Sequence, residues 1–327
     1  MGRVDEFQRR HVWAGLPLAV VYKFIDDQGT YLAALITYYG FVSLFPLLLL
    51  LVSVLGFVLH GNPGLQHQVL HSALRDFPIV GDQIGQNVHS LHGNALALTV
   101  GIVVSLVGGL NATLAAQTAM NRVWAVPRRA RPDLLRAWGR GLLVLVVVGT
   151  GFLLTTGLSG LTTGAGSYGA EVGIGLRIAA TALAVALNAA LFLFAFRVLT
   201  ARAISLAQLW PGALSAAVAW QALQEVGTFL VAHELKGTSA TYGVFSVVLG
   251  LLAWIYLTAL VMVFCAEVNV VRAQQFWPRS LTAPFTDHAP LTDADRRAYT
   301  AYTTTEQHTS RQHIKVDFSP PNPDRQR

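Results

Sequence analysis

The chain consists of long apolar blocks separated by short polar segments. Charged residues are absent from blocks at 32–59, 95–120, 141–170, 178–196, 203–224 and 237–266. Each block is near or above the ~20 residues with which an α-helix crosses a hydrocarbon layer of ~30 Å. We therefore predict six transmembrane helices within a domain at 31–271, with spans at about 32–59, 95–120, 141–163, 176–198, 210–232 and 242–268.

The composition supports the same fold class. Hydrophobic residues make up 53% of the 327 residues and charged residues only 12%. A water-soluble globule of this composition would lack the polar residues needed to cover its surface. The sequence therefore predicts an all-α polytopic membrane protein, and it excludes a soluble enzyme or a soluble binding domain.

The orientation follows from the 23 lysine and arginine residues. Only Arg75, Arg177 and Lys236 fall on one side of the predicted spans, and all the others fall on the opposite side. Segments rich in Lys and Arg stay in the cytoplasm. We therefore predict that both termini are cytoplasmic and that 60–94 is an external loop.

Two further segments flank the predicted membrane domain. Residues 1–30 show apolar positions at helical spacing opposite polar ones, which predicts a cytoplasmic amphipathic helix lying at the membrane interface. Its apolar side is Trp13, Leu16, Val20 and Phe24, and its polar side includes Lys23, Asp26 and Asp27. This helix is either a lever or a lipid-contacting collar, or it is a simple anchor that orients the first span. Residues 272–327 are polar and rich in Thr, Pro, Arg and Asp, which predicts a disordered cytoplasmic tail.

Ionisable and amide side chains inside the predicted spans are the candidates for function, because such groups are costly in lipid. Glu225 lies in the fifth span with Gln221 one turn before it, and Arg177 enters the fourth span from the same side. Asn188 and Asn111 add polar groups to the fourth and second spans. Glu225 is open to three interpretations: a structural ion pair with Arg177, a polar site facing a substrate, or a protonated carboxyl group.

Two other features concern movement. Pro46 frees a backbone carbonyl in the first span, which makes it a candidate hinge or a static kink. Glu267 and Asn269 end the sixth span at a depth where Arg122 or Arg197 could pair with them. We predict a cytoplasmic clasp of Glu267, Asn269 and Arg122, with a gate as the alternative.

The sequence offers little material for catalysis. Five histidines between 60 and 92 lie in the external loop, and pairs such as His67 and His71 have metal-compatible spacing, but plain polar surface accounts for them better. A nucleotide-binding loop is not visible. We predict no cofactor, no bound metal, no catalytic residues and no nucleic-acid partner.

Several short motifs together resemble the YihY/BrkB family of inner-membrane proteins, including its YhjD-like branch. The motifs are Tyr38-Tyr39 with Ser43-Leu44-Phe45-Pro46, Met120-Asn121-Arg122-Val123-Trp124, Pro211-Gly212-Ala213, Thr241-Tyr242-Gly243-Val244-Phe245, Leu252-Ala253-Trp254-Ile255-Tyr256-Leu257 and Cys265-Ala266-Glu267-Val268-Asn269. Cys265 stands where glycine is common in the family.

The resemblance implies a bacterial cytoplasmic-membrane protein associated with envelope integrity and with transport of lipid or lipid-linked glycan. An old label of the family, ribonuclease, finds no support here, because metal-dependent hydrolysis needs clustered ligands. We expect a transporter or flippase of a lipid or envelope-related substrate. The alternatives are a non-transporting scaffold of the cell envelope and, remotely, a membrane-associated hydrolase. Expected partners are membrane lipids, with a homo-oligomer or envelope-assembly partners also possible.

Overall fold

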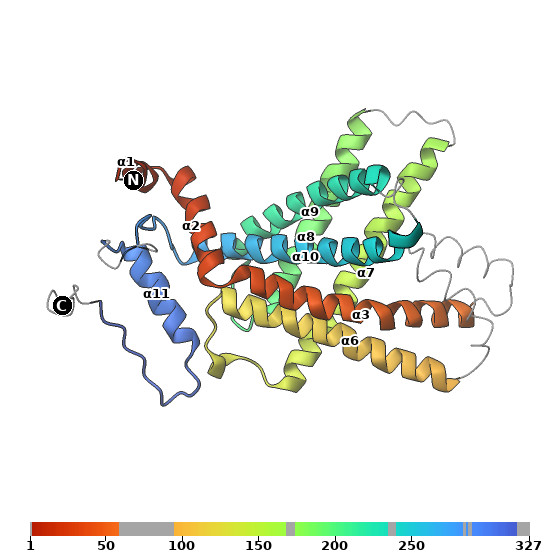
Figure 1. Ribbon diagram of the computed structural model, residues 1–327, viewed down its shortest axis with the longest axis horizontal. Coiled ribbons are helices and arrows are strands. Elements are labelled where there is room, and N and C mark those ends of the chain that lie inside the picture. The colour runs from red at the N-terminus through yellow and green to blue at the C-terminus, as the bar shows by residue number, and fades with distance from the viewer. Residues whose placement is uncertain are drawn as a thin grey trace.

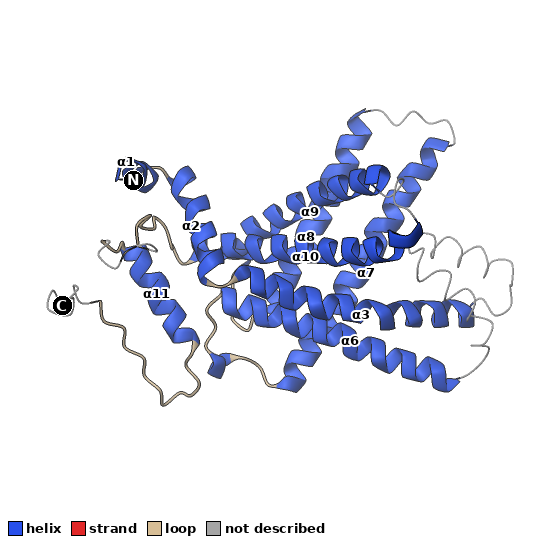
Figure 2. Cartoon of the chain, in the orientation of Figure 1, coloured by secondary structure: helices blue, strands red, loops and turns tan. Residues whose placement is uncertain are grey.

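The computed structural model describes residues 2–58, 95–167, 174–234, 240–283, 286 and 290–318. Within these ranges the chain forms helices joined by loops, and no strand is present (Figures 1 and 2). The prediction of an all-helical protein is therefore confirmed for the described part of the chain. The external loop at 60–94, with its histidines, lies outside the described residues.

Long apolar helices form the body of the molecule. They are α3 (Gly29–Val58), α6 (Ala95–Val123), α7 (Leu134–Ser167), α8 (Ile174–Leu199), α9 (Leu206–Glu234) and α10 (Ala240–Ala273). Within the described residues, four stretches are long and apolar enough to cross a membrane: Ile102–Val123, Leu134–Gly151, Thr181–Leu199 and Val248–Ala273. A shorter apolar stretch, Gly29–Leu44, lies in α3. The six-span topology and the orientation of the termini stay predictions.

The helices pack most closely at one end of the bundle. We call it the terminal end, because the N-terminal helices and the last helix lie there, on the left of Figure 1. Helix α3 packs along α6 and α10, and α9 contacts both α8 and α10. The buried core is built at this end from apolar side chains of α2, α6, α8, α9 and α10, including Val20, Met120, Phe196, Leu209, Val263 and Val270.

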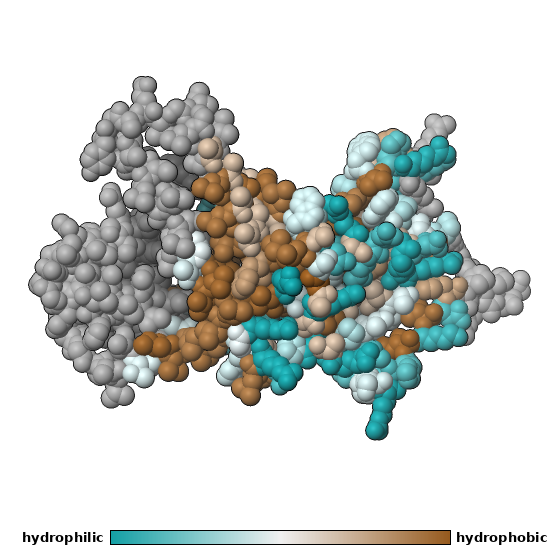
Figure 3. Space-filling view, turned by 180° about the vertical axis from the view of Figure 1, so that it is seen from behind, coloured by the Kyte–Doolittle hydropathy of each residue, from teal (hydrophilic) through white to brown (hydrophobic). Residues whose placement is uncertain are grey.

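Burial decreases along the helices with distance from the terminal end. On α6, Val103 and Val107 are exposed, whereas Ala119 and Met120 are fully buried. Helices α8 and α10 show the same gradient. Figure 1 shows α7 and α8 steeply inclined to α3, α6 and α10, so that their ends diverge away from the terminal end. A space-filling view shows apolar surface over the helices and polar surface over the terminal end (Figure 3), the division expected where lipid meets water.

The N-terminal region differs from the predicted single amphipathic helix. It forms two helices, α1 (Gly2–Arg10) and α2 (Val12–Asp26), which are separated at His11. Trp13 of the predicted apolar side is 70% exposed, while Lys23 and Asp27 of the predicted polar side are buried. The reason is that α2 packs against α10, where Lys23 finds charged partners inside the protein.

The C-terminal region also differs from the predicted disorder. Helix α11 (Asp293–Thr305) forms within it, and Ala294, Asp295 and Ala298 are buried. Thr292 begins this helix with a capping box, in which its side chain accepts a hydrogen bond from the Asp295 amide and the Asp295 carboxylate accepts one from the Thr292 amide. Such reciprocal caps satisfy amide groups that a helix start leaves open. The described part of this segment therefore contains a packed helix that its polar composition did not indicate.

Candidate functional site

A fully buried cluster of charges lies at the terminal end, where α2 and the turn after it meet α6 and α10. It consists of Lys23, Asp27 and Glu267, which we call the charge cluster. The Lys23 ammonium group donates hydrogen bonds to the Asp27 carboxylate and, over 3.1 Å, to the carbonyl oxygen of Val123. Its nitrogen also lies 3.5 Å from Oε2 of Glu267, and all three side chains are at most 1% exposed.

The charge cluster contains two carboxyl groups but only one cation. Neither carboxylate oxygen of Glu267 accepts a hydrogen bond from a described protein group. Burying a charge without full compensation is costly. Burial raises the pKa of Asp27, even though the Lys23 ammonium beside it acts in the opposite direction. This environment favours retention of a proton on Asp27 and makes the cluster sensitive to any change of its single cation.

Amide side chains tie the helix ends together around this cluster. Oδ1 of Asn269 accepts a 2.6 Å hydrogen bond from the amide of Gly212, and Oδ1 of Asn121 accepts a 2.7 Å hydrogen bond from the amide of Ala201. A Cβ atom at position 212 would overlap the carbonyl oxygen of Cys265, so glycine is required for this approach of α9 to α10. These bonds join α9 to α10 and join α6 to the loop between α8 and α9.

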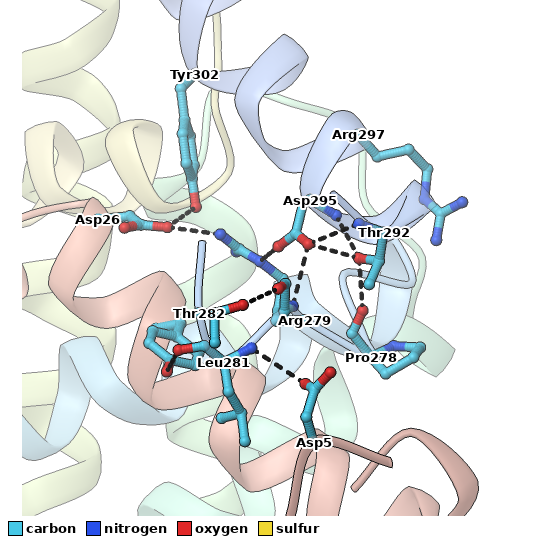
Figure 4. A network of polar contacts seen from close by, with 12 residues as sticks. Asp5, Asp26, Pro278, Arg279, Leu281, Thr282, Thr292, Asp295, Arg297 and Tyr302 are labelled. Atoms are coloured by element: carbon cyan, nitrogen blue, oxygen red, sulfur yellow. Dashed lines mark hydrogen bonds and ion pairs between the residues drawn. The ribbon is translucent and has the colours of Figure 1, made fainter. Parts of the chain in front are cut away.

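A second network binds the C-terminal region to the N-terminal helices (Figure 4). Arg279 donates to Oδ1 of Asp295 over 2.6 Å and to Oδ2 of Asp26 over 3.0 Å. The hydroxyl group of Tyr302 also donates to Oδ2 of Asp26, at 3.0 Å. We call Arg279, Asp295, Asp26 and Tyr302 the tail network. It adjoins the charge cluster, because the Lys23 ammonium lies 5.1 Å from the centre of the Tyr302 ring.

The electrostatics of the tail network keep Arg279 charged and Tyr302 protonated at neutral pH. Burial alone would lower the pKa of Arg279, but Tyr302, Asp295 and Asp26 outweigh burial and raise that pKa. Burial and the charge of Asp26 raise the pKa of Tyr302, although Arg279 acts against them. A charged arginine with charged and hydrogen-bonded partners is the arrangement that makes a buried ion pair stable.

The structure places the three residues of the predicted clasp at the terminal end, but Arg122 does not pair with Glu267 or Asn269 there. Glu267 and Asn269 both lie buried at the terminal end, as the sequence indicated, but their partners differ from those predicted. Glu267 lies beside Lys23, whereas Arg122 pairs with Glu306 over 3.2 Å. The difference arises because Arg122 is partly exposed and directed to the start of the C-terminal loop, while Lys23 is fully enclosed. Arg197, the other predicted partner, is exposed elsewhere at this end.

The predicted polar path within the membrane is only partly described. Asn188 of α8 is buried, and Asn111 of α6 and Gln221 of α9 are half-buried. In the described part of the chain no hydrogen bond joins these three side chains to one another. Glu225, Arg177 and Pro46 lie in helical backbone, but their side chains fall outside the described ones, so the proposed ion pair and hinge stay predictions.

The described residues do not form a metal-binding site. Among the residues that the structure describes, no group of three or more His, Cys, Asp or Glu side chains is arranged to hold a metal ion. Cys265 is a free, buried cysteine of α10. The sequence analysis did not single out the buried network residues Lys23, Arg279 and Asp295. A signal for Lys23 was present, since it is the only charged residue between 12 and 25.

Comparison with known proteins identifies the family of this chain. The profile of the family described as virulence factor BrkB matches residues 20–287, which include the whole charge cluster and Arg279. The chain belongs to the BrkB family. The resemblance inferred from the motifs is thereby confirmed, and α11 lies beyond the matched region.

The relatives of this BrkB-family chain are bacterial membrane proteins. It is 28% identical to a UPF0761 membrane protein of Azotobacter vinelandii over 79% of this chain and 63% of the relative, and 26% identical to a UPF0761 membrane protein of Pseudomonas paraeruginosa over 84% and 68%. It is 27% identical to the inner membrane protein YhjD of Escherichia coli over 80% of this chain and 82% of YhjD. The chain thus spans just under two thirds of the Azotobacter relative. No solved structure matches it.

Proposed function

We propose that this BrkB-family chain is a six-span protein of the bacterial cytoplasmic membrane, with both termini in the cytoplasm. We further propose that it transports or flips a lipid or another envelope-related substrate and so contributes to envelope integrity. The proposal includes no enzymatic step and no cofactor. The placement of the protein in the inner membrane is supported by its similarity to a relative named as an inner membrane protein. Its orientation is supported by the bias of Lys and Arg toward one side.

The observation that carries the transport proposal is the gradient of packing along the helices. At the terminal end, buried polar contacts close the bundle, whereas apolar side chains farther along α6, α8 and α10 are exposed. A lipid substrate needs lateral entry between helices from the bilayer, and a closed opposite end keeps the membrane sealed. In this proposal the charge cluster is part of the cytoplasmic seal.

The proposed substrate path lies in the middle of the spans. It is formed by Glu225, Gln221, Asn188 and Asn111, with Arg177 entering from the outer side, and Pro46 is the proposed hinge of α3. Polar groups at membrane depth are kept where they face a partner or a wet cavity. Glu225 is the most costly of these groups to bury, and it therefore supplies the most direct test.

The test is lipid exchange between leaflets. The purified protein is reconstituted in liposomes that carry fluorescent phospholipids, and exchange is followed by quenching of the outer leaflet. We expect exchange above that of empty liposomes, and we expect Glu225→Gln to reduce it at least tenfold. Glu234→Gln, which removes a carboxylate at the end of the same helix, is the matched control and should retain exchange. Folded protein without exchange would count against passive lipid transport.

A second candidate function is favoured by the tail network. Arg279 joins the C-terminal region to Asp26, so that distant parts of the chain form one rigid assembly at the terminal end. This rigidity suits a non-transporting scaffold of the envelope. The same experiment separates the candidates, because a scaffold predicts no leaflet exchange in the wild type and no effect of Glu225→Gln.

A further inference from the structure

A hollow lined by three arginines lies at the terminal end, on the side of the molecule formed by α7, α8 and the start of α9. Arg140 comes from α7, Arg197 from the last turn of α8, and Arg202 from the loop between α8 and α9. The hydroxyl-bearing residues Thr200 and Ser205 also line it. Its volume is about 460 Å³, which is large enough for a phosphorylated head group.

These arginines have no acidic partner among the residues that the structure describes. In the part of the chain that the structure describes, no carboxylate lies within 4 Å of the guanidinium groups of Arg140, Arg197 or Arg202. The polar contact of Arg140 is a long one, 3.4 Å, to the carbonyl oxygen of Thr200. Clustered guanidinium groups repel one another, and their planar donors match the oxygens of a phosphate group. The positive charge of this hollow therefore favours the binding of an anion.

The basic surface continues beyond this hollow. Arg202 also lines a neighbouring hollow of about 550 Å³, which is bounded on its other side by Arg296 and Arg297 of α11. Arg297 donates to the carbonyl oxygen of Gln275, which leaves the rest of its guanidinium group available. The two hollows together suit a ligand that carries more than one negative charge.

The surroundings distinguish a lipid from a soluble anion. Arg197 lies near the end of the apolar stretch Thr181–Leu199, and Arg140 lies in the first half of the stretch Leu134–Gly151. Leu143, one turn after Arg140 on the same face of α7, is 48% exposed, and Leu206 and Trp210 at the start of α9 are half-exposed. Cationic groups thus lie beside exposed apolar ones, which is the arrangement that a head group and its acyl chains require.

We propose that this hollow binds the phosphate head group of an anionic membrane lipid, with Arg140, Arg197 and Arg202 as its ligands. The proposal rests on the placement of α7 and α8 in a membrane, but it does not depend on transport. A lipid held there would fix the loop between α8 and α9 at the membrane surface, next to the hydrogen bond that joins Ala201 to Asn121.

The test measures lipid binding to the full-length protein in a neutral detergent. Adducts are counted by native mass spectrometry during titration with cardiolipin, phosphatidylglycerol or phosphatidylcholine. We expect the two anionic lipids to bind and phosphatidylcholine to bind much more weakly. Arg197→Gln with Arg202→Gln should weaken binding of the anionic lipids about tenfold or more, since each arginine at a membrane surface contributes substantially. Arg197→Lys with Arg202→Lys should retain most of it.

The matched control is the pair Arg129→Gln and Arg311→Gln. Both residues are exposed and lie outside the two hollows, so this variant removes the same charge without changing the site. Unchanged binding in the control supports a specific site. An equal loss of binding in both variants would show that only the net charge of the protein matters, and it would overturn the proposal. Equal binding of phosphatidylcholine would overturn it as well. Inorganic phosphate that displaces the lipids at millimolar concentration would identify a soluble phosphate ligand instead and overturn the lipid assignment.

Discussion

The terminal end contains two kinds of positively charged side chain, one buried and paired, the other open and without a described acidic partner. Lys23 and Arg279 are buried and matched by carboxylates, whereas Arg140, Arg197 and Arg202 surround an open hollow without any described acidic partner. A buried cation needs its partners inside the fold, because water cannot compensate it. A cation left exposed without a partner adds little to folding and is available for a ligand. We therefore expect the first group to contribute to stability and the second to contribute to binding.

The largest effect is expected when the charge cluster loses its only cation. Lys23→Met leaves Asp27 and Glu267 buried together without a positive charge. Breaking a buried pair by removal of one partner costs about 3–5 kcal/mol. We expect a large drop in the midpoint of thermal unfolding in detergent, which can be followed by circular dichroism.

A double variant checks the cause of this loss. Lys23→Met with Asp27→Asn removes the cation together with the carboxyl group to which it donates a hydrogen bond, and we expect it to recover part of the lost stability. Recovery would give a large interaction energy in the double-mutant cycle. If Lys23→Met alone unfolds like the wild type, the charge cluster does not stabilise the fold.

A smaller and more local effect is expected in the tail network. Arg279→Gln removes both guanidinium bonds, but Asp295 still accepts hydrogen bonds from the amides of Ser280 and Thr292. We expect a loss of about 2–3 kcal/mol, confined to the attachment of α11, because hydrogen bonds to charged groups contribute about that much. Amide hydrogen exchange over 293–305 should become ~30–100-fold faster, while α6 and α10 keep their protection.

Arg296→Gln is the control for this change. Arg296 is an exposed residue of the same helix, and its substitution removes one charge without touching the network. Equal acceleration of exchange in both variants would show that the charge of α11, and not the bonds of Arg279, holds the helix in place.

The sequence predicted the parts of the molecule that depend on local pattern. Uncharged blocks indicated the long helices, and short motifs indicated the family, because both are encoded in consecutive residues. Glu267 and Asn269 were also placed correctly at the end of α10. The burial of Lys23 was not predicted, because an i, i+4 pair with Asp27 is equally typical of a solvated helix face, although the absence of other charges between 12 and 25 was a signal for it.

Contacts between distant segments explain the rest of the difference. Arg279 bonds to Asp26, which is 253 residues away along the chain, and nothing in the polar composition of the tail indicates that contact. The basic hollow was missed for the same reason: Arg140, Arg197 and Arg202 count only as cytoplasmic charge until α7 and α8 bring them together. Positive charge by itself predicted a side of the membrane, whereas its distribution between buried and open sites required the fold.

The smallest effect on folding is expected from substitutions in the arginine-lined hollow. A small effect there would separate a role in binding from a role in stability. Without lipid, Arg197→Gln with Arg202→Gln should change the free energy of unfolding by no more than about 0.5 kcal/mol, as is usual for exposed positions without partners. Added cardiolipin should raise the unfolding temperature of the wild type, because a ligand of the folded state stabilises it by mass action. The variant should lack this increase. A variant destabilised as strongly as Lys23→Met would instead place these arginines among the structural charges, and the contrast between the two groups would disappear.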